Sequence, residues 1–186
     1  MNWELINKES LIKTIPFEVE KLHFRHLVRN EKLAPYYRLH CKDWVTVVAI
    51  TTNDDSLFVK QPRAGSLDYS LETPGGMIDS ADPNLTSSAL RELEEETGYT
   101  SSNIRKIGSI NPNPALFDNK LHIFLALECD VKKNRKCFPD PEEEIKLIKI
   151  PWKSVRRDFS EAGIDSALSA LAILQANSVL DSMKYS

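Results

Sequence analysis

Four glutamates crowd one short stretch of this chain: Glu92, Glu94, Glu95 and Glu96. Because an α-helix advances about 100° per residue, Glu92 and Glu96 should stack on one face with Glu95 beside them, while Glu94 points away. Like charges four residues apart repel one another, so such a stripe is favoured where a cation sits. Hard divalent cations such as Mg²⁺ take oxygen ligands. The pattern predicts either a divalent-metal site or a solvated acidic face.

The elements around the glutamates favour the metal site. We expect a helix from about Pro83 to Thr97, in which Asp82 accepts from free amide groups and Gly98 forms a left-handed cap. Arg91 can hold the carboxylates with its planar fork. The opposite face should pack against a core, and it carries Thr86, Leu90, Leu93 and Thr97. Before the helix, Pro74-Gly75-Gly76 predicts a turn.

Residues 75–99 resemble the Nudix box, G-x5-E-x7-R-E-U-x-E-E-x-G-U, where U is a bulky apolar residue. The run from Arg91 to Tyr99 matches every specified position, and Gly76 matches the opening glycine. Asp82 stands where the motif has glutamate, and eight residues instead of seven separate it from Arg91. We expect the extra residue to add to the front of the helix without rotating the glutamates.

The resemblance extends to the ADP-ribose pyrophosphatase branch of the Nudix superfamily. That branch typically carries a Q-x-R segment, matched here by Gln61-Pro62-Arg63, and an L-E-x-P-x-G segment, matched by residues 71–76. Its members also have an N-terminal β region that helps to form a homodimer. The resemblance therefore implies a homodimeric enzyme that hydrolyses the pyrophosphate bond of a nucleoside diphosphate sugar. The first expected substrate is ADP-ribose, which gives AMP and ribose 5-phosphate.

The resemblance also assigns roles to residues of the box. Glu92, Glu95 and Glu96 would ligate Mg²⁺, with Mn²⁺ as a possible substitute, and the carbonyl oxygen of Gly75 would add a ligand. Arg91 would orient the carboxylates. Arg91, Glu95 and Glu96 are therefore expected catalytic residues.

Other candidates lie outside the box. Arg63 could contact a substrate phosphate, since guanidinium matches phosphate geometry, or could be a solvated arginine. Glu72 could contact a ribose or an amide of the substrate, or pin the turn. A general base is expected on a late loop, where Glu143 is preferred over Glu142 and Glu144. Alternatives are a solvated charge cluster and water activated by the metal alone.

A nucleotide base needs an aromatic stacking surface. Trp3 is expected to be exposed in a monomer and is a candidate platform across a dimer interface. Trp44 begins a predicted core strand, so packing is its expected role, with substrate contact as the alternative.

Composition bounds the class of protein. The chain is 41% hydrophobic and 27% charged, with a net charge of -3, which favours a globular protein and gives no reason to expect a nucleic-acid partner. Cys41, Cys129 and Cys137 match no zinc spacing, so they are expected to be free thiols in a reducing, cytoplasmic compartment. Neither a signal peptide nor a membrane-spanning stretch is apparent.

Hydrophobic periodicity predicts an α/β/α sandwich with a mixed sheet. We expect a small antiparallel N-terminal β region for dimerisation over residues 1–42, with strands from about Leu11, and a Nudix hydrolase domain over residues 43–186. Strands are expected at residues 44–51, 57–61, 69–73, 104–110, 120–129 and 145–150. Helices are expected at residues 152–161 and 165–183.

Two alternative functions stay open. The substrate could be GDP-mannose, another nucleoside diphosphate sugar, a nucleoside triphosphate or capped RNA. The domain could instead sense nucleotides without hydrolysing them. The intact set of Glu92, Glu95 and Glu96 argues against the second reading, whereas Asp82 and the extra residue leave it open.

Overall fold

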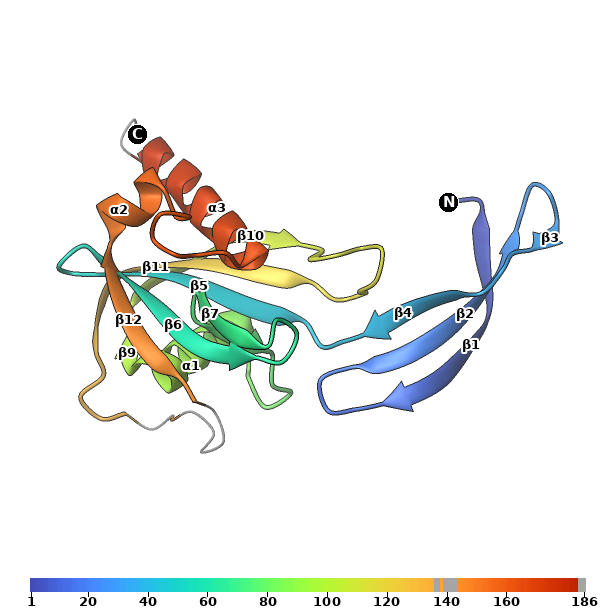
Figure 1. The fold of residues 1–186 in the computed structure, drawn as a ribbon, viewed down its shortest axis with the longest axis horizontal. Coiled ribbons are helices and arrows are strands. Elements are labelled where there is room, and N and C mark those ends of the chain that lie inside the picture. Colours follow the sequence, from blue (N-terminus) through green and yellow to red (C-terminus); the bar gives the residue numbers. More distant parts are fainter. Residues whose placement is uncertain (136–137, 139–143, 184–186) are drawn as a thin grey trace. The chain divides into compact units, whose positions relative to one another are not determined.

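The computed structural model describes residues 1–135, 138 and 144–183 (Figure 1). The chain divides into two compact units. The first comprises Met1–Asp43 and Ile110–Lys120, and the second comprises Trp44–Ser109 and Leu121–Ser186. Each unit is described by itself.

The first unit is built on an antiparallel sheet. Its strands are β1 (Trp3–Lys13), β2 (Glu18–His26), β3 (Glu31–Lys32) and β4 (Tyr36–His40). Strand β2 lies in the middle and pairs with the other three, so β1 is an edge strand. The expected antiparallel N-terminal region is confirmed, although its first strand begins at Trp3 and not near Leu11.

A buried carboxylate anchors this unit. Glu20 on β2 is only 1% exposed and lies 2.7 Å from Lys8 Nζ and 2.5 Å from Arg38 Nε. Asp118, from the second segment of the unit, lies 3.4 Å from Arg38 Nη1 and 2.7 Å from His40 Nδ1. Although burial raises the pKa of Glu20, its bonds to Lys8 and Arg38 outweigh that effect and lower the pKa overall.

The second unit is an α/β/α sandwich around a mixed sheet, as expected (Figure 1). Its main strands run in the order β10-β11-β5-β6-β12, with β11 and β5 parallel and β6 antiparallel to both β5 and β12. Their bounds are β5 (Trp44–Thr51), β6 (Asp55–Arg63), β10 (Asn103–Ile110), β11 (Leu121–Val131) and β12 (Lys146–Pro151). Three short strands join this sheet: β7 (Asp68–Glu72) beside β6, β8 (Gly75–Met77) beside β5, and β9 (Tyr99–Thr100) beside β11.

Helix α1 (Leu85–Thr97) and helix α3 (Ala167–Met183) both contact β5, and they cover opposite faces of the sheet (Figure 1). Alternate β5 residues Val45, Val47 and Ala49 join the core cluster of α1, because successive side chains of a strand point to opposite faces. Helix α2 (Trp152–Arg157) ends four residues earlier than expected, at the extended residue Asp158. None of the helices in the described ranges is long and apolar enough to span a membrane.

The expected turn at Pro74-Gly75-Gly76 is only partly correct. Residues Gly75–Met77 form strand β8, which pairs with the start of β5. A Cβ atom on Gly75 would lie 2.2 Å from the carbonyl oxygen of Val45. Only glycine therefore allows this pairing, and the sequence signal for a turn reflects a close backbone approach.

We expect Glu20→Gln to destabilise the protein by about 3 kcal/mol at pH 7, because the change leaves Lys8 and Arg38 without their buried countercharge. The pKa of Glu20 is lower folded than unfolded, so its contribution is present above about pH 4.3 and is lost as pH falls through the folded pKa. Urea denaturation at pH 7 and pH 3 measures both effects. The exposed β1 residue Glu4 supplies the control, Glu4→Gln. Equal stability of the two variants at pH 7 would contradict the anchoring role.

Candidate active site

Helix α1 begins later than the sequence suggested. Asn84, with extended φ and ψ of -164° and 170°, is the N-cap, and its side chain accepts from the Ser87 N–H at 2.9 Å. The prediction that Asp82 and Pro83 start the helix is therefore wrong, and the extra residue of the motif lies in the loop before α1. Gly98 closes the helix with φ 76°, as expected, and its N–H donates to the Glu94 carbonyl oxygen.

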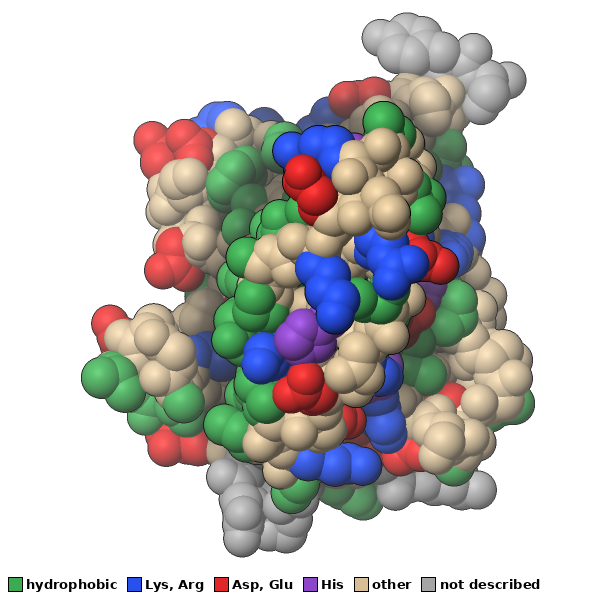
Figure 2. Space-filling view, turned by 90° about the vertical axis from the view of Figure 1, so that its right-hand side faces the viewer, with side chains coloured by type: hydrophobic (Ala, Val, Ile, Leu, Met, Phe, Trp, Pro, Cys, Tyr) green, Lys and Arg blue, Asp and Glu red, His purple; other side chains and the backbone are tan. Residues whose placement is uncertain are grey.

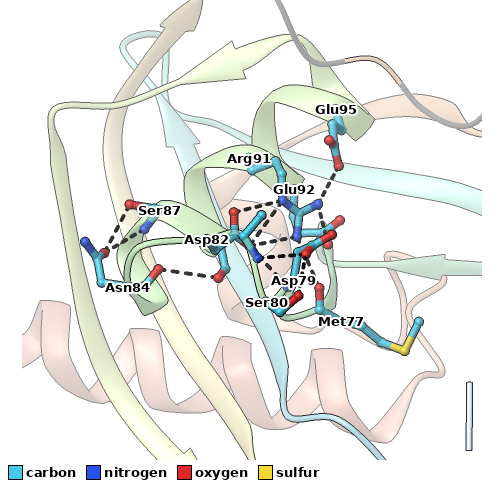
Figure 3. A network of polar contacts seen from close by, with 11 residues as sticks. Met77, Asp79, Ser80, Asp82, Asn84, Ser87, Arg91, Glu92 and Glu95 are labelled. Carbon is cyan, nitrogen blue, oxygen red and sulfur yellow. Dashed lines mark hydrogen bonds and ion pairs between the residues drawn. The ribbon is translucent and has the colours of Figure 1, made fainter.

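Arg91 is the centre of the polar network in front of the helix (Figure 3). Its Nη1 lies 2.7 Å from Glu95 Oε2 and 3.0 Å from Glu92 Oε1. Its Nη2 donates to Asp82 Oδ2 and to the carbonyl oxygen of Met77, both at 3.1 Å. Burial alone would lower the pKa of Arg91. The acidic neighbours have the larger, opposite effect and raise the pKa overall, so the guanidinium stays charged. One side chain therefore connects the loop, β8 and two helix carboxylates.

Asp82 has a defined place in this network although it departs from the motif. Both of its oxygens accept from Arg91, at 3.1–3.3 Å. Burial alone would raise the pKa of Asp82. Hydrogen bonds from Arg91 and Ser88, together with the charge of Arg91, outweigh this effect and lower the pKa overall. The shorter carboxylate thus stays ionised and reaches Arg91 from the loop before α1.

Two of the predicted metal ligands flank the glycine strand β8. Glu96 Oε2 accepts from the Gly75 N–H at 2.8 Å. The Glu92 carboxylate occupies the space beside Gly76, where a Cβ atom would lie 2.6 Å from Oε1. Two glycines therefore determine where these carboxylates can lie, one by donating a hydrogen bond and the other by leaving room.

The remaining faces of α1 follow the sequence in part. Leu93 and Thr97 are buried as expected, whereas Thr86 is exposed and Leu90 is half-buried. Glu94 leaves the acidic stripe, as expected, but it is buried, with Lys132 Nζ 4.0 Å from its Oε2.

The donor set at β8 fits a divalent cation. Carboxylate oxygens and a backbone carbonyl oxygen are the ligands that Mg²⁺ and Mn²⁺ take. Arg91 draws Glu92 and Glu95 to itself and the Gly75 N–H holds Glu96, so the three acids do not close into a group with all ligand atoms within 4.8 Å of one another.

Within the ranges that the structure describes, one other set does meet that limit: Glu20, His40 and Asp118 in the first unit. Lys8 and Arg38 already neutralise Glu20, so a metal ion would have to displace two bound cations. We assign this set a structural role.

Arg63 and Glu72, both predicted substrate contacts, are brought together across β6 and β7. Arg63 Nε and Nη2 donate to the two Glu72 oxygens, each at 2.9 Å. Burial raises the pKa of Glu72, but hydrogen bonds from Arg63 and Ser70 outweigh it and lower the pKa overall. Both residues line a cavity of about 440 Å³ in the second unit.

Of the two candidate aromatic platforms, Trp3 is less exposed than predicted. Trp3 is half-buried in the first unit, and its ring centroid lies 5.0 Å from that of Tyr36 and 5.7 Å from that of Phe24. The expectation of an exposed Trp3 is therefore wrong, because these rings cover it. Trp44 is half-buried at the start of β5.

The predicted general base lies outside the described residues, as do Glu142 and the rest of residues 139–143. Glu144 is described, and its Oε1 accepts from the Tyr69 hydroxyl at 2.7 Å. This bond raises the pKa of Tyr69.

Sequence reasoning missed a chain of buried hydroxyls behind the glycine strand. Thr73 pairs with Thr46 of β5 at 2.7 Å and with Ser169 of α3 at 3.1 Å, and its N–H donates to Ser169 at 3.0 Å. These contacts fasten the start of α3 to the residue before Pro74. Ser169 is one of three serines in α3, and its position in the sequence gave no signal of this pairing.

The site thus consists of an acidic helix whose carboxylates contact one arginine and a glycine strand, in an α/β/α sandwich. The profile of the NUDIX domain matches residues 42–164. The chain therefore belongs to the NUDIX family, and it is a pyrophosphohydrolase of that family.

Several curated proteins are similar to this chain. An ADP-ribose pyrophosphatase of Bacillus subtilis is 32% identical over 143 residues, which is 75% of this chain and 76% of the relative. A methanol dehydrogenase activator of Bacillus methanolicus is 30% identical over 69% of each chain. A GDP-mannose pyrophosphatase of Escherichia coli is 24% identical over 73% of this chain and 70% of the relative.

The fold also matches a solved structure. A crystal structure described as an ADP compounds hydrolase superposes with a TM-score of 0.82 at 20% identity, and the match covers 98% of this chain and 96% of that chain. At this identity the likeness supports the fold alone.

Gly76→Ala should lower metal-dependent turnover by about 10- to 100-fold, because the new methyl group displaces the Glu92 carboxylate. The fold should survive, since the clash is with the end of a flexible side chain and not with the backbone. Gly65→Ala is the control, because nothing lies within 4 Å of its Cβ position. Steady-state kinetics and circular dichroism of both variants check this. Unchanged turnover of Gly76→Ala would remove Glu92 from the site.

Proposed function

We propose that this protein hydrolyses the pyrophosphate bond of a nucleoside diphosphate sugar in the presence of a divalent cation. ADP-ribose is the favoured substrate, with AMP and ribose 5-phosphate as products. The observation that carries the proposal is the grouping of Glu92, Glu95 and Arg91 beside the glycine strand β8 that holds Glu96. The ADP-ribose pyrophosphatase of Bacillus subtilis among the relatives supports the choice of substrate.

The residues divide the work at this site. Glu92, Glu95 and Glu96, with the carbonyl oxygen of Gly75, would hold Mg²⁺ or Mn²⁺. When bound, such a cation neutralises phosphoryl oxygens and makes a water ligand more acidic. Arg91 restricts Glu92 and Glu95 to a few orientations, and the Gly75 N–H does the same for Glu96. Prior ordering of the ligands reduces the cost of assembling the site.

The attacking water must lose a proton. Either a general base accepts this proton, or a metal ion acidifies the water enough that no separate base is needed. Glu143 stays the predicted general base, with Glu142 as an alternative. Glu144 is less suitable because one of its oxygens already accepts from Tyr69.

Substitution of Glu96 tests the metal-dependent function. Glu96→Gln should lower magnesium-dependent hydrolysis of ADP-ribose by about 100-fold or more, because loss of the carboxylate charge weakens the hold on the cation that would neutralise the phosphoryl oxygens. The amide oxygen can still accept from the Gly75 N–H, so thermal stability should change little. Glu161→Gln, an exposed carboxylate on a loop, is the control. A Glu96 variant with normal turnover would refute the role of this acid.

GDP-mannose is the alternative substrate, and the GDP-mannose pyrophosphatase relative favours testing it. A panel of ADP-ribose, GDP-mannose, other nucleoside diphosphate sugars and nucleoside triphosphates, each with Mg²⁺ and Mn²⁺, ranks the candidates by kcat/KM. A sensor that binds nucleotides without hydrolysis is disfavoured, because Asp82 keeps its contact with Arg91 and all three glutamates are retained.

We also propose that residues 1–42 form a dimerisation region and residues 43–186 the hydrolase. Strand β1 pairs with β2 on one side only, and a free strand edge is a template for pairing with another chain. Large apolar side chains on the first unit are exposed, and Figure 2 shows hydrophobic side chains at the surface among charged ones. The exposed apolar residues of the first unit include Leu5, Leu11, Ile12 and Ile15. Trp3 stays a candidate platform for the nucleotide base.

Charge on β1 should separate the subunits. Ile12→Lys should convert a dimer into a monomer, because a buried unpaired ammonium is costly at an interface. Leu174→Lys on α3 is the control, since both side chains are more than half exposed in one chain, at 59% and 53%. Light scattering after size-exclusion chromatography gives the masses. A monomeric wild type, or a dimeric Ile12 variant, would refute the proposed interface.

A further inference from the structure

The cavity beside Arg63 is lined by groups that the catalytic network does not use. They come from the end of β6, from β7 and from the segment that leads into α3. The lining includes Arg63, Asp68, Tyr69, Glu72, Asp165 and Ser166. The last two were not candidates in the sequence, because the region before α3 carries no motif.

The charge of this lining disfavours a phosphate group. Three carboxylates, on Asp68, Glu72 and Asp165, face a single guanidinium. That guanidinium already donates two hydrogen bonds to Glu72. A phosphate in this cavity would therefore meet an excess of negative charge, whereas a neutral group with hydroxyls could donate hydrogen bonds to the carboxylates.

The backbone on either side of Asp165 is anchored, although the Asp165 side chain is exposed. The preceding residue, Ile164, is 2% exposed, and its N–H donates to the Phe159 carbonyl oxygen at 3.0 Å. Four residues further on, Ser169 is also 2% exposed and is bonded to Thr73. Asp165 itself makes no hydrogen bond or ion pair with the residues that the structure describes, so its carboxylate is available to a ligand.

The cavity adjoins the proposed metal site along the chain. Glu72 lines the cavity, and Gly75, three residues later, donates to Glu96. Three residues of extended chain span at most about 11 Å. A substrate with its diphosphate at Gly75 could therefore place a neighbouring group in the cavity.

We propose that this cavity binds the sugar of the substrate and that Asp165, supported by Ser166, determines sugar specificity by accepting hydrogen bonds from sugar hydroxyls. This inference rests on the proposed function for the identity of the substrate. Glu72 and Arg63 also line the cavity, as a pair joined by two hydrogen bonds. The segment before α3 thus serves as a specificity element of the second unit.

Calorimetric titration of ribose 5-phosphate and of AMP into the full-length protein tests the proposal without requiring turnover. Asp165→Asn keeps the size of the side chain but removes its charge and one acceptor. The substitution should weaken the binding of ribose 5-phosphate about 10-fold or more, because hydrogen bonds to charged groups are strong. The affinity for AMP should not change. Ser166→Ala should act in the same direction but less. Glu161→Gln, a carboxylate of the same loop outside the cavity, should change neither affinity.

The kinetic counterpart is a rise in KM for ADP-ribose with kcat nearly unchanged. Several results for Asp165→Asn would overturn the proposal. They are an unchanged affinity for ribose 5-phosphate, equally weakened binding of both ligands, and weakened binding of AMP alone, which would assign the cavity to the nucleoside. Tighter binding of ribose 5-phosphate to Asp165→Asn would also overturn it, because loss of negative charge favours a phosphate in the cavity. The variants could show the expected differences in binding while wild-type protein cleaves no diphosphate sugar. That outcome would refute the proposed function but would still support the sugar site.

Discussion

The arrangement of the acidic side chains depends on one positively charged side chain, the guanidinium of Arg91. Arg91 is surrounded by Asp82, Glu92 and Glu95, with the carbonyl oxygen of Met77 as a further acceptor. Without it, the carboxylates of α1 would repel one another and the loop before the helix would lose its contact with them. The planar fork contacts several acceptors at once, which the single ammonium of a lysine does not reproduce. The acidic helix can therefore bring Glu92 and Glu95 close together without leaving their charges uncompensated.

Local periodicity in the sequence predicted the helix and the central strand that carry the site. It did not predict the tertiary contacts between them. The helical repeat placed Glu92 and Glu96 on one face, and the apolar run gave strand β5 its observed bounds at Trp44 and Thr51. It did not distinguish Asn84 from Asp82 as the N-cap, because both residue types cap helices well and a distant arginine engages Asp82. The apparent turn at Gly75 became a strand for a similar reason. Its glycine serves a close approach to β5, which is a tertiary contact.

The two faces of the sheet contribute differently to the same glycine strand. On one face, α1 brings the carboxylates and its apolar side packs on alternate β5 residues such as Val45 and Val47. On the other face, Thr46 and Ser169 hold Thr73 through hydroxyl groups. Buried hydroxyls are costly unless they are paired, and here each pairs with another. The glycine strand and Thr73, which precedes it by two residues, are thereby held from both sides of the sheet.

The bond between Thr73 and Ser169 joins residues that are 96 positions apart. During synthesis, the acidic helix and its glycine strand leave the ribosome well before α3 does. Since domains complete their folding only when their parts are available, a nascent chain that has reached β12 carries the acidic helix without the Ser169 hydroxyl that bonds to Thr73. The hydrogen bonds on this side of the sheet therefore form only after α3 has been synthesised.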